Sequence, residues 1–289
     1  MILLKELLIC PIKINITLRV LSQRSDGYHE IISLFWKKKG IEGLTIQPNR
    51  NENIGDILET EGIKIDGENI LTKTLIWARS RCQDIPSLRI LLKKEFPMGS
   101  GIGAGSGNSA AMLRWLSTRY GLDIVNDSVS MIGADVPFLA GDKDVALISG
   151  IGEKADPLGQ LSGLNLLLVF PGWKTDTMVA YMELDNLRKH KENKYCLEEY
   201  KMEALAIFDK LKSKEKVGLL PNDFLEVILK EHSEYCTAFD IAEKSGSLAW
   251  GLSGSGSALF MIFKDSISLK TAKQFLEHEE WVTKTTELE

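Results

Sequence analysis

The sequence predicts a two-lobed α/β protein, and three observations carry this prediction. The chain has 289 residues, enough for two hydrophobic cores of moderate size. An apolar strand, LRILLKKEF (88–96), leads through a glycine-rich segment into an apolar helix, AAMLRWLSTRY (110–120). A second apolar strand, LNLLLVF (164–170), is also followed by a turn and a helix. We therefore expect an N-terminal lobe of residues 1–153 and a C-terminal lobe of residues 154–289.

Composition and charge exclude several classes of function. Hydrophobic residues make up 44% of the chain and charged residues 26%, which is typical of soluble globular proteins and argues against disorder. The formal charge of -5 argues against broad nucleic-acid binding, which needs a basic surface, although Lys93 and Lys94 could meet a small anion. We therefore expect no nucleic-acid partner. The partner we predict is a small molecule, and we expect the chain to be a monomer or a weak homodimer.

Cysteine spacing and hydropathy predict a cytoplasmic protein without membrane contact. The cysteines are Cys10, Cys82, Cys196 and Cys236. No C-x-x-C pair occurs among them, so neither a zinc site nor a disulfide framework is predicted, and reduced thiols fit best. The apolar opening, MILLKELLIC, is interrupted by Lys5 and Glu6, which favours a first strand over a signal peptide. No other apolar run approaches membrane-spanning length.

Residues 97–111, PMGSGIGAGSGNSAA, are the most informative segment. Five glycines lie between Gly99 and Gly107, so backbone N–H groups can approach a ligand closely. The small residues from Asn108 to Ala111 suit the start of a helix, whose first-turn amides have no partner within the helix and lie at the positive end of its dipole. The segment therefore predicts a phosphate-binding loop. A tight turn or a flexible connection is the alternative.

Two better-known phosphate loops do not describe this segment. The Walker pattern G-x-x-x-x-G-K-[ST] is absent because the chain contains no Gly-Lys pair. The dinucleotide-binding pattern survives only in a degenerate form, at Gly99, Gly101 and Ala104, and it does not follow a first strand. A dinucleotide-binding protein is therefore the runner-up from another class.

A strand is predicted over residues 7–21, where polar and apolar residues alternate. This periodicity places Lys13, Asn15 and Thr17 on one face, and Lys13 is either a solvent-facing lysine or part of a site. A turn over residues 25–27 follows. The rings closest to that turn belong to Tyr28, His29 and Phe35. Read alone, the histidine belongs to a loop or to the core.

Two further segments carry candidate polar residues. Helical periodicity over residues 67–85 predicts a helix that packs under the strand at residues 88–96, with Asn69 as its cap or as a ligand-binding residue. Further on, Pro137 ends any preceding helix, so Asp135 is predicted at a helix-to-strand junction where its side chain can project into a cleft. A turn or capping aspartate is the alternative.

The second lobe contains a second glycine turn. After the strand at residues 164–170, a helix is predicted that Thr175 or Thr177 could cap, with Tyr181 about one turn further on. Charged and mostly helical sequence follows. The glycine turn within residues 251–263 is either a second anion-binding nest or a hairpin. A helix and a strand close the chain, and the final strand could return to the first lobe.

Five of these segments together resemble the GHMP kinase superfamily: PIKINITLRVL, DGYHE, the glycine segment, GADVPF and LSGSGSALF. DGYHE and GADVPF are similar to the branch that phosphorylates a CDP-linked methylerythritol in the non-mevalonate isoprenoid pathway. The resemblance covers nearly the whole chain. It implies a ribosomal-S5-like N-terminal lobe, a GHMP-type C-terminal lobe and an active site in the cleft between them.

The resemblance also implies roles for individual residues. Asp135 matches the family's catalytic aspartate and Lys13 its partner lysine, with ATP as the phosphoryl donor and Mg²⁺ as a cofactor whose ligands the sequence does not identify. The implied substrate-side residues, whose aromatic and polar groups would hold the cytidine, are Asn15, Tyr28, His29, Phe35, Thr177 and Tyr181. The implied ATP-side residues are Asn69, Pro97, Met98, Gly99, Ser100, Gly101, Ile102, Gly103, Ala104, Gly105, Ser106, Gly107 and Asn108.

The glycine segment departs from the family pattern at positions that could contact phosphate. The family loop often reads G-G-G-S-S-[DN]-A-A, whereas this chain has Ala104 in place of one glycine and Gly107 in place of the second serine. The missing hydroxyl removes a possible phosphate or metal contact. Two alternatives remain open: another GHMP kinase, of the homoserine or mevalonate type, and a nucleotide-binding relative without catalytic activity.

Overall fold

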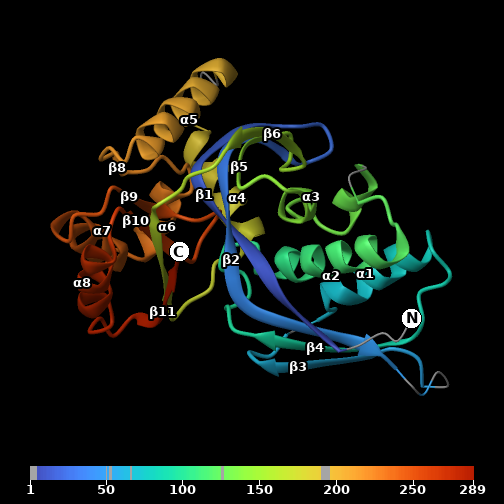
Figure 1. Ribbon diagram of the computed structural model, residues 1–289. Coiled ribbons are helices and arrows are strands. Elements are labelled where there is room, and N and C mark those ends of the chain that lie inside the picture. The colour runs from blue at the N-terminus through green and yellow to red at the C-terminus, as the bar shows by residue number, and fades with distance from the viewer. Residues whose placement is uncertain (1–4, 50, 52–53, 66, 125–126, 190–195) are drawn as a thin grey trace. The chain divides into compact units, whose positions relative to one another are not determined.

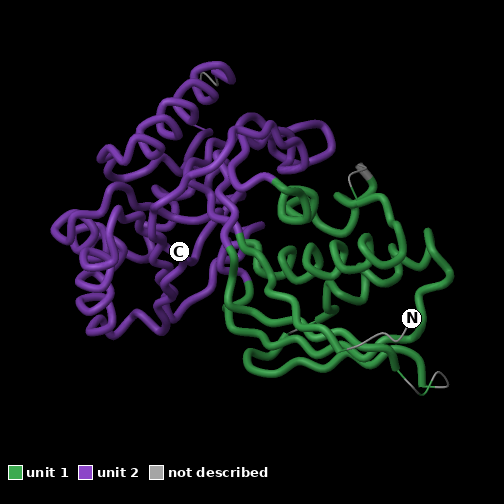
Figure 2. Tube along the Cα trace, viewed as in Figure 1, with its two compact units in different colours: residues 1–12, 39–98, 103–142 green, residues 13–38, 99–102, 143–289 purple. Residues whose placement is uncertain are grey.

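The protein is described from a computed structural model, which covers residues 5–49, 51, 54–65, 67–124, 127–189 and 196–289 (Figure 1). It has a mixed α/β fold, as predicted, and its residues group into two compact units (Figure 2). The first unit comprises Met1–Ile12, Lys39–Met98 and Gly103–Asp142, and the second comprises Lys13–Lys38, Gly99–Ile102 and Lys143–Glu289. Strands β1 (Glu6–Gln23) and β2 (His29–Pro48) contribute residues to both units. The lobe boundary at residue 153 stays a prediction.

In the first unit, two helices cover one face of a small sheet (Figure 1). Strand β4 (Leu88–Lys94) pairs antiparallel with the end of β2 and parallel with β3 (Ile57–Gly62). Helices α1 (Ile70–Arg79) and α2 (Ala104–Tyr120) bury their apolar residues in one core with alternate residues of β4. The predicted order of strand, glycine segment and helix is therefore confirmed.

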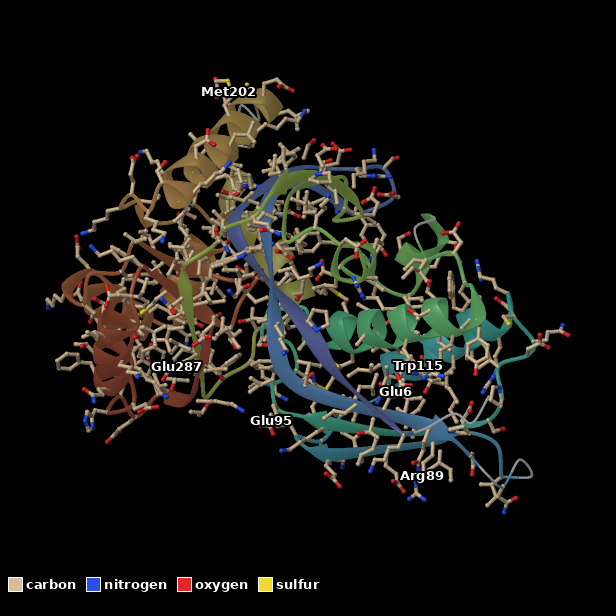
Figure 3. The ribbon with its side chains drawn as sticks, in the orientation of Figure 1. Glu6, Arg89, Glu95, Trp115, Met202 and Glu287 are labelled. Atoms are coloured by element: carbon tan, nitrogen blue, oxygen red, sulfur yellow. The ribbon has the colours of Figure 1, made fainter. Side chains whose placement is uncertain are left out.

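A hydrogen bond also ties α2 to the first strand. The indole Nε1 of Trp115 donates to Glu6 Oε2 over 3.1 Å, and Figure 3 shows the two labelled side chains pointing toward each other. Trp115 is buried, so this bond satisfies a donor that would otherwise lose its water partners. It fixes the middle of α2 against β1.

The start of α2 differs from the prediction. The helix begins at Ala104, inside the glycine segment, instead of near Asn108. Gly103 precedes it with φ +65°, a left-handed conformation that glycine adopts without steric cost. Gly105, Ser106 and Gly107 are therefore helical, and the first-turn amides that could bind a phosphate belong to the glycine segment itself.

Asp135 also lies in a different local structure from the predicted one. It occupies the N-cap position of a short helix, α3 (Val136–Ala140), and not a helix-to-strand junction. Pro137 is in the first turn of α3, where a missing N–H costs no intrahelical bond, so it begins this helix instead of ending a preceding one. A 3-10 helix, η2 (Asp127–Met131), precedes this segment.

The second unit contains two groups of strands. The beginning of β2 pairs with β5 (Val145–Ser149), which pairs with β6 (Lys154–Gly159). A five-stranded sheet has the order β11-β7-β10-β9-β8. Its strands are β7 (Asn165–Pro171), β8 (Gly218–Leu219), β9 (Ala249–Leu252), β10 (Leu259–Phe263) and β11 (Val282–Leu288), the last of which pairs with β7.

Helices pack around this five-stranded sheet. Helices α7 and α8 contact its strands, and α5 carries Met202 at an exposed position (Figure 3). The helices of the second unit are α4 (Thr177–Arg188), α5 (Leu197–Lys212), α6 (Leu225–Glu231), α7 (Glu234–Lys244) and α8 (Ser266–Leu276). In the described part of the chain, no helix is both long and apolar enough to span a membrane.

Two details of the second unit decide between the predicted alternatives. Strands β9 and β10 pair antiparallel on either side of residues 253–258, so the second glycine turn is a hairpin. The cap of α4 is Asp176, whose carboxylate accepts hydrogen bonds from the N–H groups of Met178 and Val179. The prediction of Thr175 or Thr177 as the cap was wrong, because a charged acceptor between the two threonines bonds the first-turn amides instead.

Candidate active site

Lys13 is the centre of a buried polar group in the second unit. Its side chain is 5% exposed, so the solvent-facing alternative is wrong. The ammonium donates to Asn15 Oδ1 over 2.6 Å and to the carbonyl oxygen of Gly101 over 3.1 Å. It also lies 4.6 Å from the ring centroid of Phe35, which is fully buried. The cation of Lys13 is thereby held directly beside the glycine segment.

The polar group continues along β1 and β2. Asn15 donates from Nδ2 to Ser33 Oγ over 3.0 Å, and Ser33 in turn donates to the carbonyl oxygen of Thr17. The N–H of Asn15 donates to Ser253 Oγ over 3.3 Å, and Ser253 donates to Gly101 O over 3.0 Å. Every hydroxyl in this chain of contacts has a defined partner, so the position of Lys13 is fixed by its surroundings.

Residues 99–102 of the glycine segment pack against the β9–β10 hairpin. A Cβ atom at Gly101 would lie 2.0 Å from the carbonyl oxygen of Ser253 and 2.9 Å from that of Gly256. The N–H of Ala258 donates to Ser100 O over 3.1 Å. The hairpin therefore serves as a backbone support for the segment, which explains why glycine occupies position 101.

Residues 103–108 have a different support, within the first unit. A Cβ atom at Gly107 would lie 1.7 Å from the carbonyl oxygen of Pro11 in β1. No serine can occupy this position without moving the helix or the strand, which accounts for the glycine where the family pattern has its second serine. A Cβ atom at Gly105, by contrast, would have no atom within 4 Å, so this side of the first turn is open.

The same helix start is hydrogen-bonded, through Asn108, to a buried ion pair that joins β2 and β4. Glu42 and Lys94 are 1% and 3% exposed, and Lys94 Nζ lies 2.7 Å from Glu42 Oε1. The carboxylate also accepts hydrogen bonds from the N–H groups of Glu95 and Phe96 and from Asn108 Nδ2. The Asn108 amide is thus turned toward Glu42, and its predicted ATP contact stays a prediction.

The Cys10 thiol lies next to this cluster. Burial raises the pKa of this thiol to about 12, partly offset by a hydrogen bond with Asn108. Cys10 is therefore protonated and unreactive at neutral pH, and it contributes packing rather than chemistry.

The structure places the other two predicted residues of the first unit at helix starts. Asn69 caps α1, and its Oδ1 accepts a hydrogen bond from the N–H of Leu71 over 3.0 Å. Asp135 occupies the N-cap position of α3, but its side chain makes no capping hydrogen bond. The cap role is confirmed for Asn69, whereas the carboxylate of Asp135 is not used as a cap.

On the predicted substrate side, His29 and Tyr181 come together in the second unit. Their rings stack at 4.9 Å with an interplanar angle of 22°, and the edge of Phe224 meets Tyr181 at 4.8 Å. Tyr28 is 61% exposed. Thr177 Oγ1 lies 2.9 Å from Ser255 Oγ in the hairpin. The aromatic and hydroxyl groups implied for the base are therefore present, and their contacts with a substrate stay a prediction.

The structure also adds residues that the sequence did not indicate: Ser33, Glu42 and Asp185. Asp185 accepts a hydrogen bond from His29 Nε2 over 2.9 Å. One signal could have found it, since Asp185 follows Tyr181 by four residues on a predicted helix and so shares its face. Glu42 has no comparable signal. The pairing of Lys13 with Asp135 joins residues of different units and stays a prediction.

Comparison with known proteins agrees with this arrangement. The family described as GHMP kinases N terminal domain matches residues 69–146, and GHMP kinases C terminal matches residues 205–282. A 4-diphosphocytidyl-2-C-methyl-D-erythritol kinase of Porphyromonas gingivalis is 33% identical over 269 residues, which is 90% of this chain and 93% of that protein. One of Thermotoga maritima is 32% identical over 255 residues, 87% of this chain and 89% of that protein.

Solved structures of kinases also match this chain. The crystal structure of a 4-(cytidine 5'-diphospho)-2C-methyl-D-erythritol kinase matches with a TM-score of 0.78 and 25% identity, covering 99% of this chain and 98% of that chain. A homoserine kinase from Cytophaga hutchinsonii matches with a TM-score of 0.63 at 12% identity, covering 99% and 94%, and this likeness concerns the fold alone.

Proposed function

The chain belongs to the GHMP kinases, and from this premise we propose that it transfers the γ-phosphoryl group of ATP to the 2-hydroxyl of 4-diphosphocytidyl-2-C-methyl-D-erythritol. The observation that carries the proposal is the buried ammonium of Lys13, which is bonded to Gly101 O in the glycine segment. Phosphoryl transfer depends mainly on positioning and on charge stabilisation, and a fixed cation beside a phosphate loop supplies both.

In the proposed reaction, the carboxylate of Asp135 accepts the proton of the 2-hydroxyl while the hydroxyl oxygen attacks the γ-phosphorus. The bond from the γ-phosphorus to the bridging oxygen breaks, and ADP leaves with that oxygen. Lys13 stabilises negative charge near the transferring group. The first-turn amides of α2, on the side left open at Gly105, bind phosphate oxygens.

Magnesium fits this site as an ion that arrives with ATP. Mg²⁺ takes few protein ligands and completes its shell with phosphate oxygens and water. Among the described residues, no cluster of three or more histidine, cysteine, aspartate or glutamate side chains could hold a metal. Ser106 Oγ lies 3.5 Å from where a Cβ of Gly133 would be, two residues before Asp135. Ser106, whose hydroxyl lies near this segment, is therefore a candidate protein ligand, and the ion would neutralise phosphate charge.

On the substrate side, the cytosine ring stacks on Tyr28 and Tyr181, and His29 reads its polar edge. Asn15, Phe35 and Thr177 complete the pocket. A base-reading pocket is what distinguishes this substrate from free alcohols such as homoserine or mevalonate, which offer no ring to stack. A panel that compares phosphorylation of the CDP-linked alcohol with that of homoserine and mevalonate tests the choice.

Asp135→Asn tests the reaction itself. The amide keeps the shape of the side chain but cannot take up the proton, so kcat should fall by about 10² to 10⁴ while the melting temperature changes little. Asp142→Asn is the matched control: this exposed carboxylate pairs with Arg114 at the surface, where an ion pair contributes little, so activity should persist. Near-normal turnover of Asp135→Asn would remove Asp135 from the assigned role.

A further inference from the structure

The imidazole of His29 is held by a carboxylate from a distant part of the chain. His29 Nε2 lies 2.9 Å from Asp185 Oδ1, across 156 positions of sequence. The His29 side chain is 6% exposed and that of Asp185 is 39% exposed. The ring also stacks on Tyr181, one turn before Asp185 on α4. Two contacts from a single helix therefore fix both the position of the ring and the direction in which its Nε2 points.

Helix α4 is itself anchored at both ends. Asp176 caps its first turn, and Thr177 bonds Ser255 in the β9–β10 hairpin. At the other end, Arg188 donates to the carbonyl oxygen of Val20 over 2.9 Å and to Asp223 Oδ2 over 2.6 Å. Asp185 lies between these anchors, so the backbone that carries its carboxylate is held beside His29.

The carboxylate determines which ring nitrogen of His29 carries the proton. An ionised carboxylate only accepts hydrogen bonds, so Nε2 must be the donor. In a neutral imidazole the other nitrogen, Nδ1, then has no proton and is an acceptor. Within the described part of the chain, the hydrogen bond from Nε2 is the one that the His29 side chain makes. Nδ1 has no such bond and is not fully enclosed by the protein. A ligand atom can therefore reach Nδ1.

We propose that Asp185 is a positioning residue that sets base specificity, by holding His29 in the tautomer whose Nδ1 accepts a hydrogen bond. This inference rests on the proposed function, in which His29 reads the edge of the base. An acceptor at this point favours the exocyclic amino group of cytosine and disfavours uracil, which presents a carbonyl oxygen at the same position. The pocket thus selects cytidine because the Asp185 carboxylate keeps the imidazole proton of His29 on Nε2, on the side away from the base.

Binding of CMP and UMP to the full-length protein tests this assignment without depending on turnover. The wild type should bind CMP at least about 10-fold more tightly than UMP, since a site built around one acceptor rejects an analogue without the donor. Asp185→Asn should reduce this ratio to about threefold or less, because an amide can donate or accept and no longer fixes the tautomer. Glu183→Gln is the matched control: Glu183 lies on the same helix and has no hydrogen bond or ion pair with any residue that the structure describes, so the variant should keep the wild-type ratio.

Nitrogen-15 NMR of His29 provides the second readout, which does not require a variant. In the CMP complex near pH 8, Nε2 should show the shift of a protonated nitrogen and Nδ1 that of an unprotonated one. A proton on Nδ1 in this complex, or an equal loss of CMP and UMP affinity in Asp185→Asn, overturns the assignment. If the wild type discriminates between CMP and UMP but phosphorylates no CDP-linked alcohol, the proposed function fails while the role of Asp185 stands.

Discussion

The two halves of the glycine segment are supported in different ways. Residues 99–102 rest on the backbone of the β9–β10 hairpin, through contacts that involve neutral groups only. Residues 103–108 form the start of α2 and rest on Pro11, and Asn108 donates a hydrogen bond to Glu42 of β2, which forms a buried ion pair with Lys94 of β4. The comparison shows that one run of alternating glycines serves two purposes: close approach between backbones, and an open face at a helix start where a phosphate can enter.

The largest effect is expected at Gly101. Gly101→Ala would place a Cβ against two carbonyl oxygens of the hairpin, at a residue whose φ is +78°. Both the steric overlap and the left-handed conformation oppose a side chain, so we expect a loss of about 4 kcal/mol or more in the free energy of unfolding. Chemical denaturation of the wild type and the variant measures this change in the free energy of unfolding. A wild-type midpoint would mean that the hairpin is not the support described above.

The second effect concerns the ion pair beneath residues 103–108. Glu42→Gln removes the charge that compensates Lys94 and replaces one acceptor oxygen by an NH2 group, which must face donors whether it points to Glu95 and Phe96 or to Asn108 and Lys94. Breaking one side of a buried pair typically costs about 3 to 5 kcal/mol. Lys73→Gln, which removes an exposed pair with Glu68, is the control and should change stability by less than about 1 kcal/mol. Equal effects of the two substitutions would contradict the anchoring role.

The third prediction compares the effects on stability of alanine substitutions at two glycines of helix α2. Gly107→Ala should destabilise by about 2 kcal/mol, because its Cβ would overlap Pro11 O and force helix and strand apart. Gly105→Ala meets no atom within 4 Å, so it should stabilise the fold by about 0.5 to 1 kcal/mol through helix propensity alone. Its KM for ATP should nevertheless rise, since the new methyl group lies on the open face. Changes of the same sign in stability would refute the assignment of the two faces.

The last effect concerns the reactivity of a thiol, and it leaves stability at neutral pH unchanged. Burial raises the pKa of Cys10 to about 12, above the value of about 8.5 for an unfolded chain. The folded protein therefore favours the protonated thiol: this contribution to stability is fully present below pH of about 8.5 and is lost as the pH rises toward 12. At pH 8, iodoacetamide should label exposed Cys236 far faster than Cys10. Fast labelling of Cys10 in the native wild type would show that the helix start is not packed as described.

Much of the local structure could be predicted from the sequence, and the failures have physical reasons. The strand at residues 88–94 follows from its short apolar run before the glycine segment, and Asn69 as a cap follows from its position before an apolar helix. The start of α2 was misplaced, because a glycine-rich run predicts a loop by propensity although packing on Pro11 keeps it helical. Pro137 was misread because proline both ends helices and occupies their first turn.

The sequence by itself determined the family, the glycine segment with its helix, and the residue types for phosphate and base chemistry, because local periodicity and motif spacing encode them. Only the tertiary structure decided that Lys13 is buried beside Gly101, that Gly107 is glycine because of Pro11, and that Glu42 and Asp185 orient Asn108 and His29. Glu42 and Asn108 are 66 positions apart in the sequence, and His29 and Asp185 are 156 positions apart. No local pattern marks such a partner, since chain folding alone brings the two groups within hydrogen-bonding distance.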